Sequence, residues 1–135
     1  MSILDRWRRR RLEGRRIGRR GERLAARFLR RRGLRILERN VRSGRGEIDL
    51  LALEGQTLVF VEVKSRTDRS WRSGLEKIDR DKRRALRRAC RRYLAAIGWS
   101  AESYRVDAVT VDFDLRGWVP RLREIRWYRD VVDLD

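Results

Sequence analysis

Two carboxylates and a lysine stand inside neighbouring apolar segments of the chain. Asp49 lies within Glu47–Leu53, and Glu62 and Lys64 lie within the Val- and Phe-rich segment Leu58–Ser65. Charged groups in apolar segments are costly to bury unless an opposite charge compensates them. A divalent cation does so, and Mg²⁺ prefers a few carboxylates together with water and phosphate oxygens. These residue types therefore favour metal-assisted phosphate chemistry, in which the lysine adds a further cation.

The spacing of these residues predicts one shared site. Side chains alternate along a strand, so Glu62 and Lys64 share a face, about 7 Å apart along the strand. A four-residue turn over Glu54–Thr57 places Asp49 directly opposite Glu62 on that face, within reach of one cation. A three-residue turn would send the two carboxylates to opposite faces. The alternative is that Glu62 and Lys64 merely form a salt bridge, with Asp49 at a strand end.

Absent residue types narrow the chemistry further. The chain has no histidine, which excludes histidine-based nucleases, Ser-His-Asp and Cys-His triads, and histidine-ligated zinc. The single cysteine, Cys90, can form neither an intramolecular disulfide nor a zinc cluster. It falls in the apolar stripe of a predicted helix, so we expect a buried structural thiol.

The pattern of apolar residues predicts an α/β fold in the order αβββαββ. The expected helices are 17–33 and 79–97, with Asp79 as N-cap, and the expected strands are 34–41, 47–53, 58–65, 104–111 and 122–128. A polar loop is expected over 66–78. Strands 47–53 and 58–65 are apolar on both faces, so helices should cover both. The residues expected to face inward from the second helix are Ala85, Leu86, Ala89, Cys90, Tyr93, Leu94 and Ile97.

Two further carboxylates have open interpretations. Glu22 lies at the edge of the apolar face of the first helix, where it could face the sheet or simply be solvated. Asp107 lies in an apolar strand and is compatible with a structural role.

Composition favours a polyanionic partner. The net charge is +17, from 37 Lys and Arg against 20 Asp and Glu, and all but three of the basic residues are arginine. Arginine presents a planar fork that suits phosphate oxygens and stacks on bases. Nucleic acid is the commonest polyanion in the cytoplasm, which is the default compartment for a sequence without an apolar signal or membrane-spanning stretch. An arginine-biased proteome would explain the Arg:Lys ratio but not the net charge. We expect a basic arm, 1–16, followed by one domain, 17–135.

Several blocks together resemble a known family. They are Gly18-Arg19-Arg20-Gly21-Glu22, Gly46-Glu47-Ile48-Asp49-Leu50-Leu51, Val59-Phe60-Val61-Glu62-Val63-Lys64-Ser65-Arg66, Lys82, Ala89, Tyr93-Leu94 and Arg105-Val106-Asp107. From about Gly18 to Val111 the chain is similar to the YraN family, small bacterial proteins with the PD-(D/E)xK nuclease fold, which are similar to archaeal Holliday-junction resolvases. The resemblance implies a restriction-endonuclease-like core, with a mixed sheet flanked by helices. It also implies a metal site of Glu22, Asp49 and Glu62, with Lys64 as catalytic lysine.

The leading hypothesis is a Mg²⁺- or Mn²⁺-dependent endonuclease that hydrolyses phosphodiester bonds, with DNA favoured over RNA as its nucleic acid. One alternative is a catalytically silent nucleic-acid-binding protein that uses its arginines on phosphates. Another is a basic accessory subunit of a ribonucleoprotein. The sequence leaves open the branched or linear form of the substrate and the oligomeric state, a dimer included.

Overall fold

A computed structural model describes residues 3–44, 46–67, 80–98 and 103–132. The elements are α1 (Ile3–Arg31), β1 (Arg35–Ser43), β2 (Gly46–Glu54), β3 (Thr57–Thr67), α2 (Arg80–Ile97), β4 (Tyr104–Asp114) and β5 (Arg121–Val132). The predicted α/β order αβββαββ is confirmed. Arg66 and Thr67 belong to β3, whereas the remainder of the predicted loop and the predicted N-cap Asp79 lie outside the described residues.

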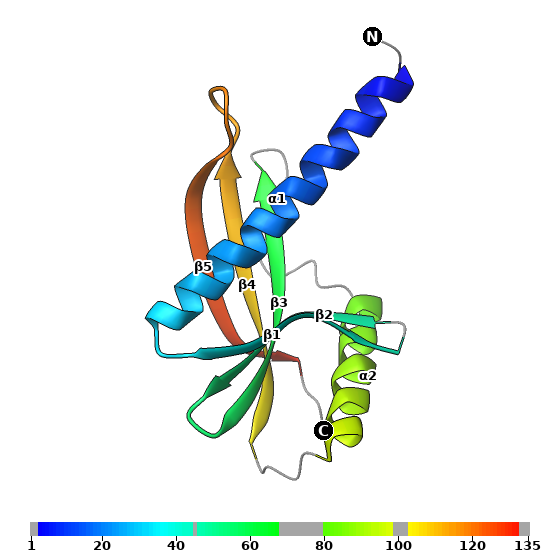
Figure 1. The fold of residues 1–135 in the computed structure, drawn as a ribbon, viewed down its shortest axis with the longest axis vertical. Helices are drawn as coiled ribbons and strands as arrows, with labels where there is room; N and C mark the ends of the chain where they lie inside the picture. The colour runs from blue at the N-terminus through cyan, green and yellow to red at the C-terminus, as the bar shows by residue number, and fades with distance from the viewer. Residues whose placement is uncertain (1–2, 45, 68–79, 99–102, 133–135) are drawn as a thin grey trace.

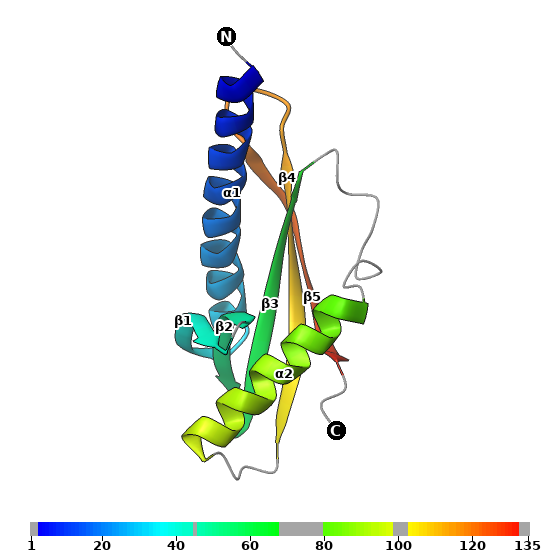
Figure 2. The ribbon, with the colours of Figure 1, turned by 90° about the vertical axis from the view of Figure 1, so that its right-hand side faces the viewer.

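The five strands form one mixed sheet in the order β1-β2-β3-β4-β5. Strands β3 and β4 run parallel and every other neighbouring pair is antiparallel. A parallel pair needs a crossover connection, and α2 lies in the segment that provides it. The two helices cover opposite faces of the sheet, α1 along β3 and β4 and α2 across β1 and β2 (Figures 1 and 2). In the part of the chain that is described, no helix is both long and apolar enough to cross a membrane.

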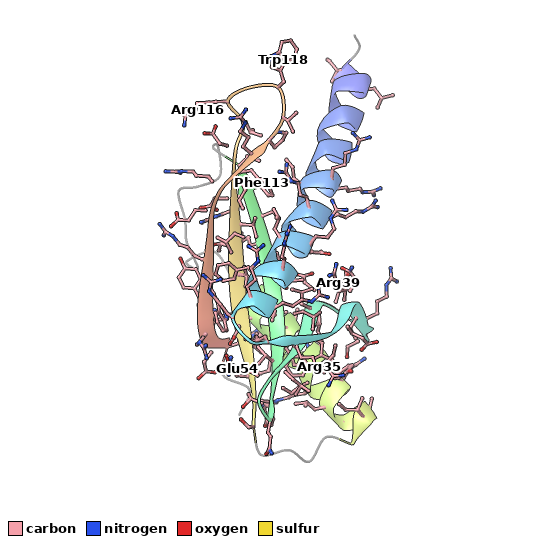
Figure 3. The ribbon with its side chains drawn as sticks, turned by 60° about the vertical axis from the view of Figure 1, so that its left-hand side comes forward. Arg35, Arg39, Glu54, Phe113, Arg116 and Trp118 are labelled. Carbon is pink, nitrogen blue, oxygen red and sulfur yellow. The ribbon has the colours of Figure 1, made fainter. Side chains whose placement is uncertain are left out.

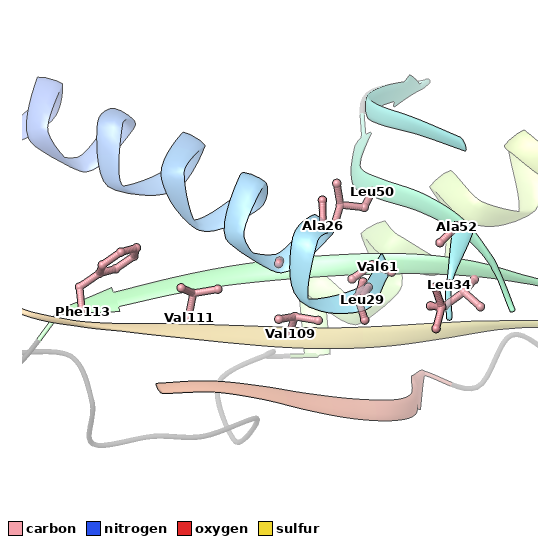
Figure 4. Close-up of a cluster of buried hydrophobic side chains, with 11 residues drawn as sticks. Ala26, Leu29, Leu34, Leu50, Ala52, Val61, Val109, Val111 and Phe113 are labelled. Carbon is pink, nitrogen blue, oxygen red and sulfur yellow. The ribbon is translucent and has the colours of Figure 1, made fainter. Parts of the chain in front are cut away.

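The sheet separates two apolar clusters, as the two-sided strands predict. The α1-side cluster contains Ala25, Ala26, Leu29, Leu34, Leu50, Ala52, Val59, Val61, Val109, Val111 and Phe113 (Figure 4). The α2-side cluster contains Ile48, Leu51, Leu58, Phe60, Ala89, Cys90, Val106 and Val132. Along β3 the valines therefore face α1, and Leu58 and Phe60 face α2, which confirms the predicted alternation.

Several boundaries and faces differ from the prediction. Helix α1 begins at Ile3 rather than near Ile17, because Arg, Leu and Glu all favour helix even where no apolar stripe marks one. Ile97 is exposed in the last turn of α2, where the helix ends beyond the strands that it covers, and Ala85 is exposed on the flank toward the β1–β2 turn. Strand β5 extends past Tyr128 to Val132.

The extension of β5 satisfies a fully buried carboxylate, Asp107. Its two oxygens accept hydrogen bonds from Arg105 Nε at 2.9 Å, Trp127 Nε1 at 2.9 Å and the backbone N–H of Asp130 at 2.9 Å. Asp130 has φ of 54°, at a register shift that turns its N–H toward Asp107. Arg105 also binds Glu54. Glu54 lies at the end of β2 (Figure 3). Asp107 therefore stabilises the β4–β5 pairing, which agrees with its structural interpretation.

Helix α1 approaches β3 most closely at Gly21. A Cβ atom added there would lie 1.8 Å from Ser65 Oγ and 3.1 Å from Ser65 Cβ. Only a glycine therefore allows the helix to lie at this distance from the strand.

We predict that Gly21→Ala lowers the free energy of unfolding by about 1–3 kcal/mol, because α1 has to move away from β3. Urea denaturation of the variant and wild type measures the difference. Adding Ser65→Ala should recover part of the loss, since Ser65 Oγ is the nearest atom and has no hydrogen-bond partner among the described residues. Equal stability of Gly21→Ala and wild type would contradict the close approach.

Candidate functional site

The β2–β3 hairpin has the register on which the predicted site depends. Leu53 pairs with Leu58 and Leu50 pairs with Val61, around a turn that contains Gly55 with φ of 60°. The predicted register is therefore confirmed from Leu50 to Glu54 of β2. Continued by one position, it would set Asp49 opposite Glu62.

Beyond Leu50 the two strands part. The β2–β3 pairing ends at Leu50 and Val61, while β2 continues to pair with β1 as far as Gly46 (Figure 1). Strict alternation along the strand predicts that Ile48 and Leu51 face opposite sides of the sheet. This prediction is wrong, because the two side chains pack in the same cluster. The reason is that β2 turns away from β3 together with β1, which rotates its side chains relative to the sheet.

Asp49 lies at the point of separation and contacts β3 through its side chain. Its Oδ2 atom accepts a hydrogen bond from the backbone N–H of Val63 at 2.8 Å. Burial raises the pKa of Asp49 to about 8, with further contributions from the charge of Glu62 and from a hydrogen bond with it. Glu62 itself is 7 % exposed. Two carboxylates in this environment favour sharing a positive charge, either a proton or a cation.

A second pair of carboxylates is joined by Asn40. With its amide nitrogen facing them, Asn40 donates to Glu22 Oε2 and to Glu47 Oε1, both at 3.1 Å. Burial raises the pKa of Glu22, and the charges of Glu47 and Glu62 add to the effect, whereas the bond from Asn40 lowers it. Glu22 therefore faces the same region as Asp49 and Glu62, from α1 instead of the sheet.

Lys64 lies with Glu22 at a hollow between α1 and β3. This pocket has a volume of about 350 Å³ and is lined by Ile17, Gly18, Glu22, Val63, Lys64, Ser65 and Thr67. Lys64 is half-buried there, so its long side chain and the Glu22 carboxylate border one solvent-accessible space.

The four predicted site residues are thus brought to one region, in two pairs. Asp49 and Glu62 are hydrogen-bonded neighbours, and Glu22 and Lys64 border one pocket. Among the described residues, no three or more His, Cys, Asp or Glu side chains stand close enough to hold one metal ion. The Asp49–Glu62 pair fits an ion that completes its shell with water and phosphate oxygens. Glu22 does not complete a three-carboxylate set in this arrangement.

Asn40 and Glu47 were not identified as site residues from the sequence. Glu47 stands two residues before Asp49, which is the spacing of a shared strand face and a usable signal. Asn40 has φ of 52°, a left-handed conformation that asparagine tolerates better than most residues. An asparagine in a strand was the available sign of this unusual backbone.

Cys90 is confirmed as a buried thiol on α2. Burial raises its pKa to about 12, and the nearby charge of Glu62 adds to this. The thiol is therefore protonated at neutral pH and is no nucleophile there.

The raised pKa of Asp49 predicts how stability changes with pH in metal-free protein. Because the folded state holds this proton more tightly than the unfolded chain, stability should fall as pH rises from about 4 to about 8. Asp49→Asn removes the titrating group and should flatten that fall, leaving the variant more stable at pH 8 by at least about 1 kcal/mol. Urea unfolding across this range measures it, with Glu124→Gln, an exposed carboxylate on β5, as the control. A profile for Asp49→Asn that parallels wild type would show that Asp49 is not the group responsible.

Comparison of the sequence with known proteins identifies the family of the chain. The sequence model described as "Uncharacterised protein family UPF0102" matches residues 21–111, which include all of the β2–β3 hairpin. A UPF0102 protein of Pseudomonas aeruginosa strain UCBPP-PA14 is 42 % identical over 117 residues, covering 86 % of this chain and 91 % of that protein. Relatives from Symbiobacterium thermophilum and Beutenbergia cavernae are 46 % and 45 % identical, over 73 % and 70 % of this chain and 83 % and 80 % of their own lengths. The chain belongs to the UPF0102 family, the YraN family that its motifs resemble.

Proposed function

We propose that this protein is a divalent-cation-dependent nuclease that hydrolyses phosphodiester bonds of DNA. The observation that supports it most is the contact between Asp49 and Glu62: Asp49 is hydrogen-bonded to Glu62 and its pKa is raised to about 8, in a chain of net charge +17. Natural proteins seldom keep such a pair buried for stability alone, since like charges in a partly dry site are costly. Perturbed carboxylates of this kind are typical of functional sites.

Each residue has a role in this proposal. Asp49 and Glu62 would hold Mg²⁺ or Mn²⁺, which when bound supplies a water of lowered pKa and stabilises charge on the phosphate. Val63 fixes the orientation of Asp49 through its N–H, so one carboxylate oxygen is held in place before substrate arrives. Lys64 would place an ammonium group at the phosphate from the neighbouring pocket. Glu22, held by Asn40, would act as an outer carboxylate that attracts the cation.

Exposed arginines along α1 support DNA as the partner. The helix borders the pocket of Glu22 and Lys64, and its exposed basic residues include Arg15, Arg16, Arg19, Arg23 and Arg27. Arginine forks suit phosphate oxygens, and a phosphate backbone along α1 would bring a scissile bond near the carboxylates.

We predict that substitutions separate metal binding from turnover. Asp49→Asn should abolish both Mn²⁺ binding and cleavage, because it removes charge from the cation's position. Lys64→Ala should retain Mn²⁺ binding but lower turnover about 100-fold or more, because the lost group acts on the transition state. Glu22→Gln should have a smaller effect than either. The measurements are Mn²⁺ titration by calorimetry and cleavage of duplex, single-stranded and branched DNA, with Glu124→Gln as the matched control.

Equal Mn²⁺ affinity of Asp49→Asn and wild type would remove Asp49 from the metal site.

One observation favours a second candidate, the silent nucleic-acid-binding protein: no group of three carboxylates forms among the described residues. Wild type that binds DNA but cuts none of these substrates, with Mg²⁺ or Mn²⁺, would establish that second function instead.

Salt dependence tests the arginine contacts separately from cleavage. Affinity for DNA should fall steeply as salt rises, because each phosphate contact releases counterions. Replacing Arg19, Arg23 and Arg27 by alanine should reduce the slope of log affinity against log salt, by about one for each lost contact. Binding measured in EDTA by fluorescence anisotropy gives these slopes. Affinity that is insensitive to salt would contradict the polyanion partner.

A further inference from the structure

The hairpin that joins β4 and β5 exposes a complete tryptophan side chain at its tip. Trp118 has a relative accessibility of 103 %, so the rest of the described molecule covers none of it. The hairpin also exposes three other large apolar side chains, Leu115, Val119 and Leu122. Tryptophan is usually well buried, and a fully exposed one in a highly charged protein suggests a binding role.

The backbone beneath Trp118 is held in a defined conformation. The Asp114 carboxylate accepts the backbone N–H of Arg116 at 2.8 Å and its guanidinium at 2.8 and 3.1 Å. Gly117 follows with φ of 109°, a conformation that a side chain would strain. The indole is therefore presented by an organised turn instead of a loose loop (Figure 3).

Helix α1 holds the base of the hairpin. Arg20 donates a hydrogen bond to the carbonyl of Pro120, and its guanidinium lies over the Phe113 ring, 5.3 Å from the centroid. Arg20 lies one residue before Gly21 and two before Glu22, so the hairpin and the candidate site share one stretch of the helix.

The hairpin also projects at the end of the molecule that carries the Glu22–Lys64 pocket. In Figures 1 and 2, the hairpin, the N-terminal half of α1 and the C-terminal end of β3 all lie at this end. Thr67 at that end of β3 lines the pocket. A long ligand that lies along α1 at the pocket would therefore extend toward Trp118.

We propose that Trp118 stacks on an unpaired base of bound DNA and gives the protein a preference for DNA with single-stranded or branched segments. This inference rests on the proposed function, since it takes DNA as the partner. Charge complementarity favours DNA as the occupant: the chain carries +17, and the hairpin continues into a β5 strand with exposed Arg121 and Arg126. An unpaired base of any type offers a flat face to an indole, whereas the faces of a base inside a duplex are covered by its stacked neighbours. The contact therefore distinguishes unpaired from paired DNA.

Binding in EDTA tests this contact without cleavage. Two probes are compared by fluorescence anisotropy: a blunt duplex, and the same duplex ending in two unpaired thymine arms. Trp118→Ala should weaken binding of the forked probe about tenfold and leave the blunt duplex within about twofold. Trp118→Phe should retain most of the preference because it keeps an aromatic face. Val119→Ala, an exposed apolar neighbour on the same hairpin, is the matched control and should bind both probes as wild type does.

The outcomes separate this inference from the nuclease proposal. If wild type binds both probes and Trp118→Ala binds the forked probe equally well, or loses affinity for both probes alike, the inference is wrong while the nuclease proposal stands. If wild type binds neither probe, both fail. Two further outcomes would overturn the inference in favour of another occupant. They are a blue shift of Trp118 emission, judged against Trp118→Phe, with anionic vesicles but not with DNA, and loss of a dimer in Trp118→Ala by sedimentation.

Discussion

The separation of β2 from β3 after Leu50 and Val61 is the constraint on which the candidate site depends. At that point the Asp49 carboxylate accepts the N–H of Val63, so a side chain continues the contact between the strands. The same separation turns Ile48 to the α2 side and gives Asp49 its position beside Glu62.

Asp49 differs from three other aspartates of the sheet in what it contacts. Asp107, Asp112 and Asp114 each accept hydrogen bonds from an arginine guanidinium, which neutralises them locally. Asp49 instead contacts a backbone N–H and Glu62, and its pKa is raised. In the proposed nuclease, Asp49 and Glu62 would hold a metal cation in place of an arginine side chain. The surrounding arginines would then serve the phosphates of the substrate.

Features that depend on residues close together in the sequence were predicted correctly. The alternation of Val59 and Val61 against Leu58 and Phe60, and the turn over Glu54–Thr57, were sufficient to predict the hairpin register as far as Leu50 and Val61. Contacts between residues distant in the sequence could not be predicted in this way. Asn40 bridges α1 and β2, and the extended end of β5 satisfies Asp107, and neither interaction leaves a periodic pattern. The twist of β2 away from β3 likewise depends on its pairing with β1.

The central claim is that Asp49 and Glu62 share one positive charge, a proton in metal-free protein and a cation when metal is bound. The most direct test is the number of protons released when Mn²⁺ binds at pH 7, obtained by calorimetry in two buffers of different ionisation enthalpy. With a pKa of about 8 for Asp49, the account predicts release of close to one proton per ion in wild type. Mn²⁺ binding with no proton release would contradict it, because Asp49 would then be ionised before the metal arrives.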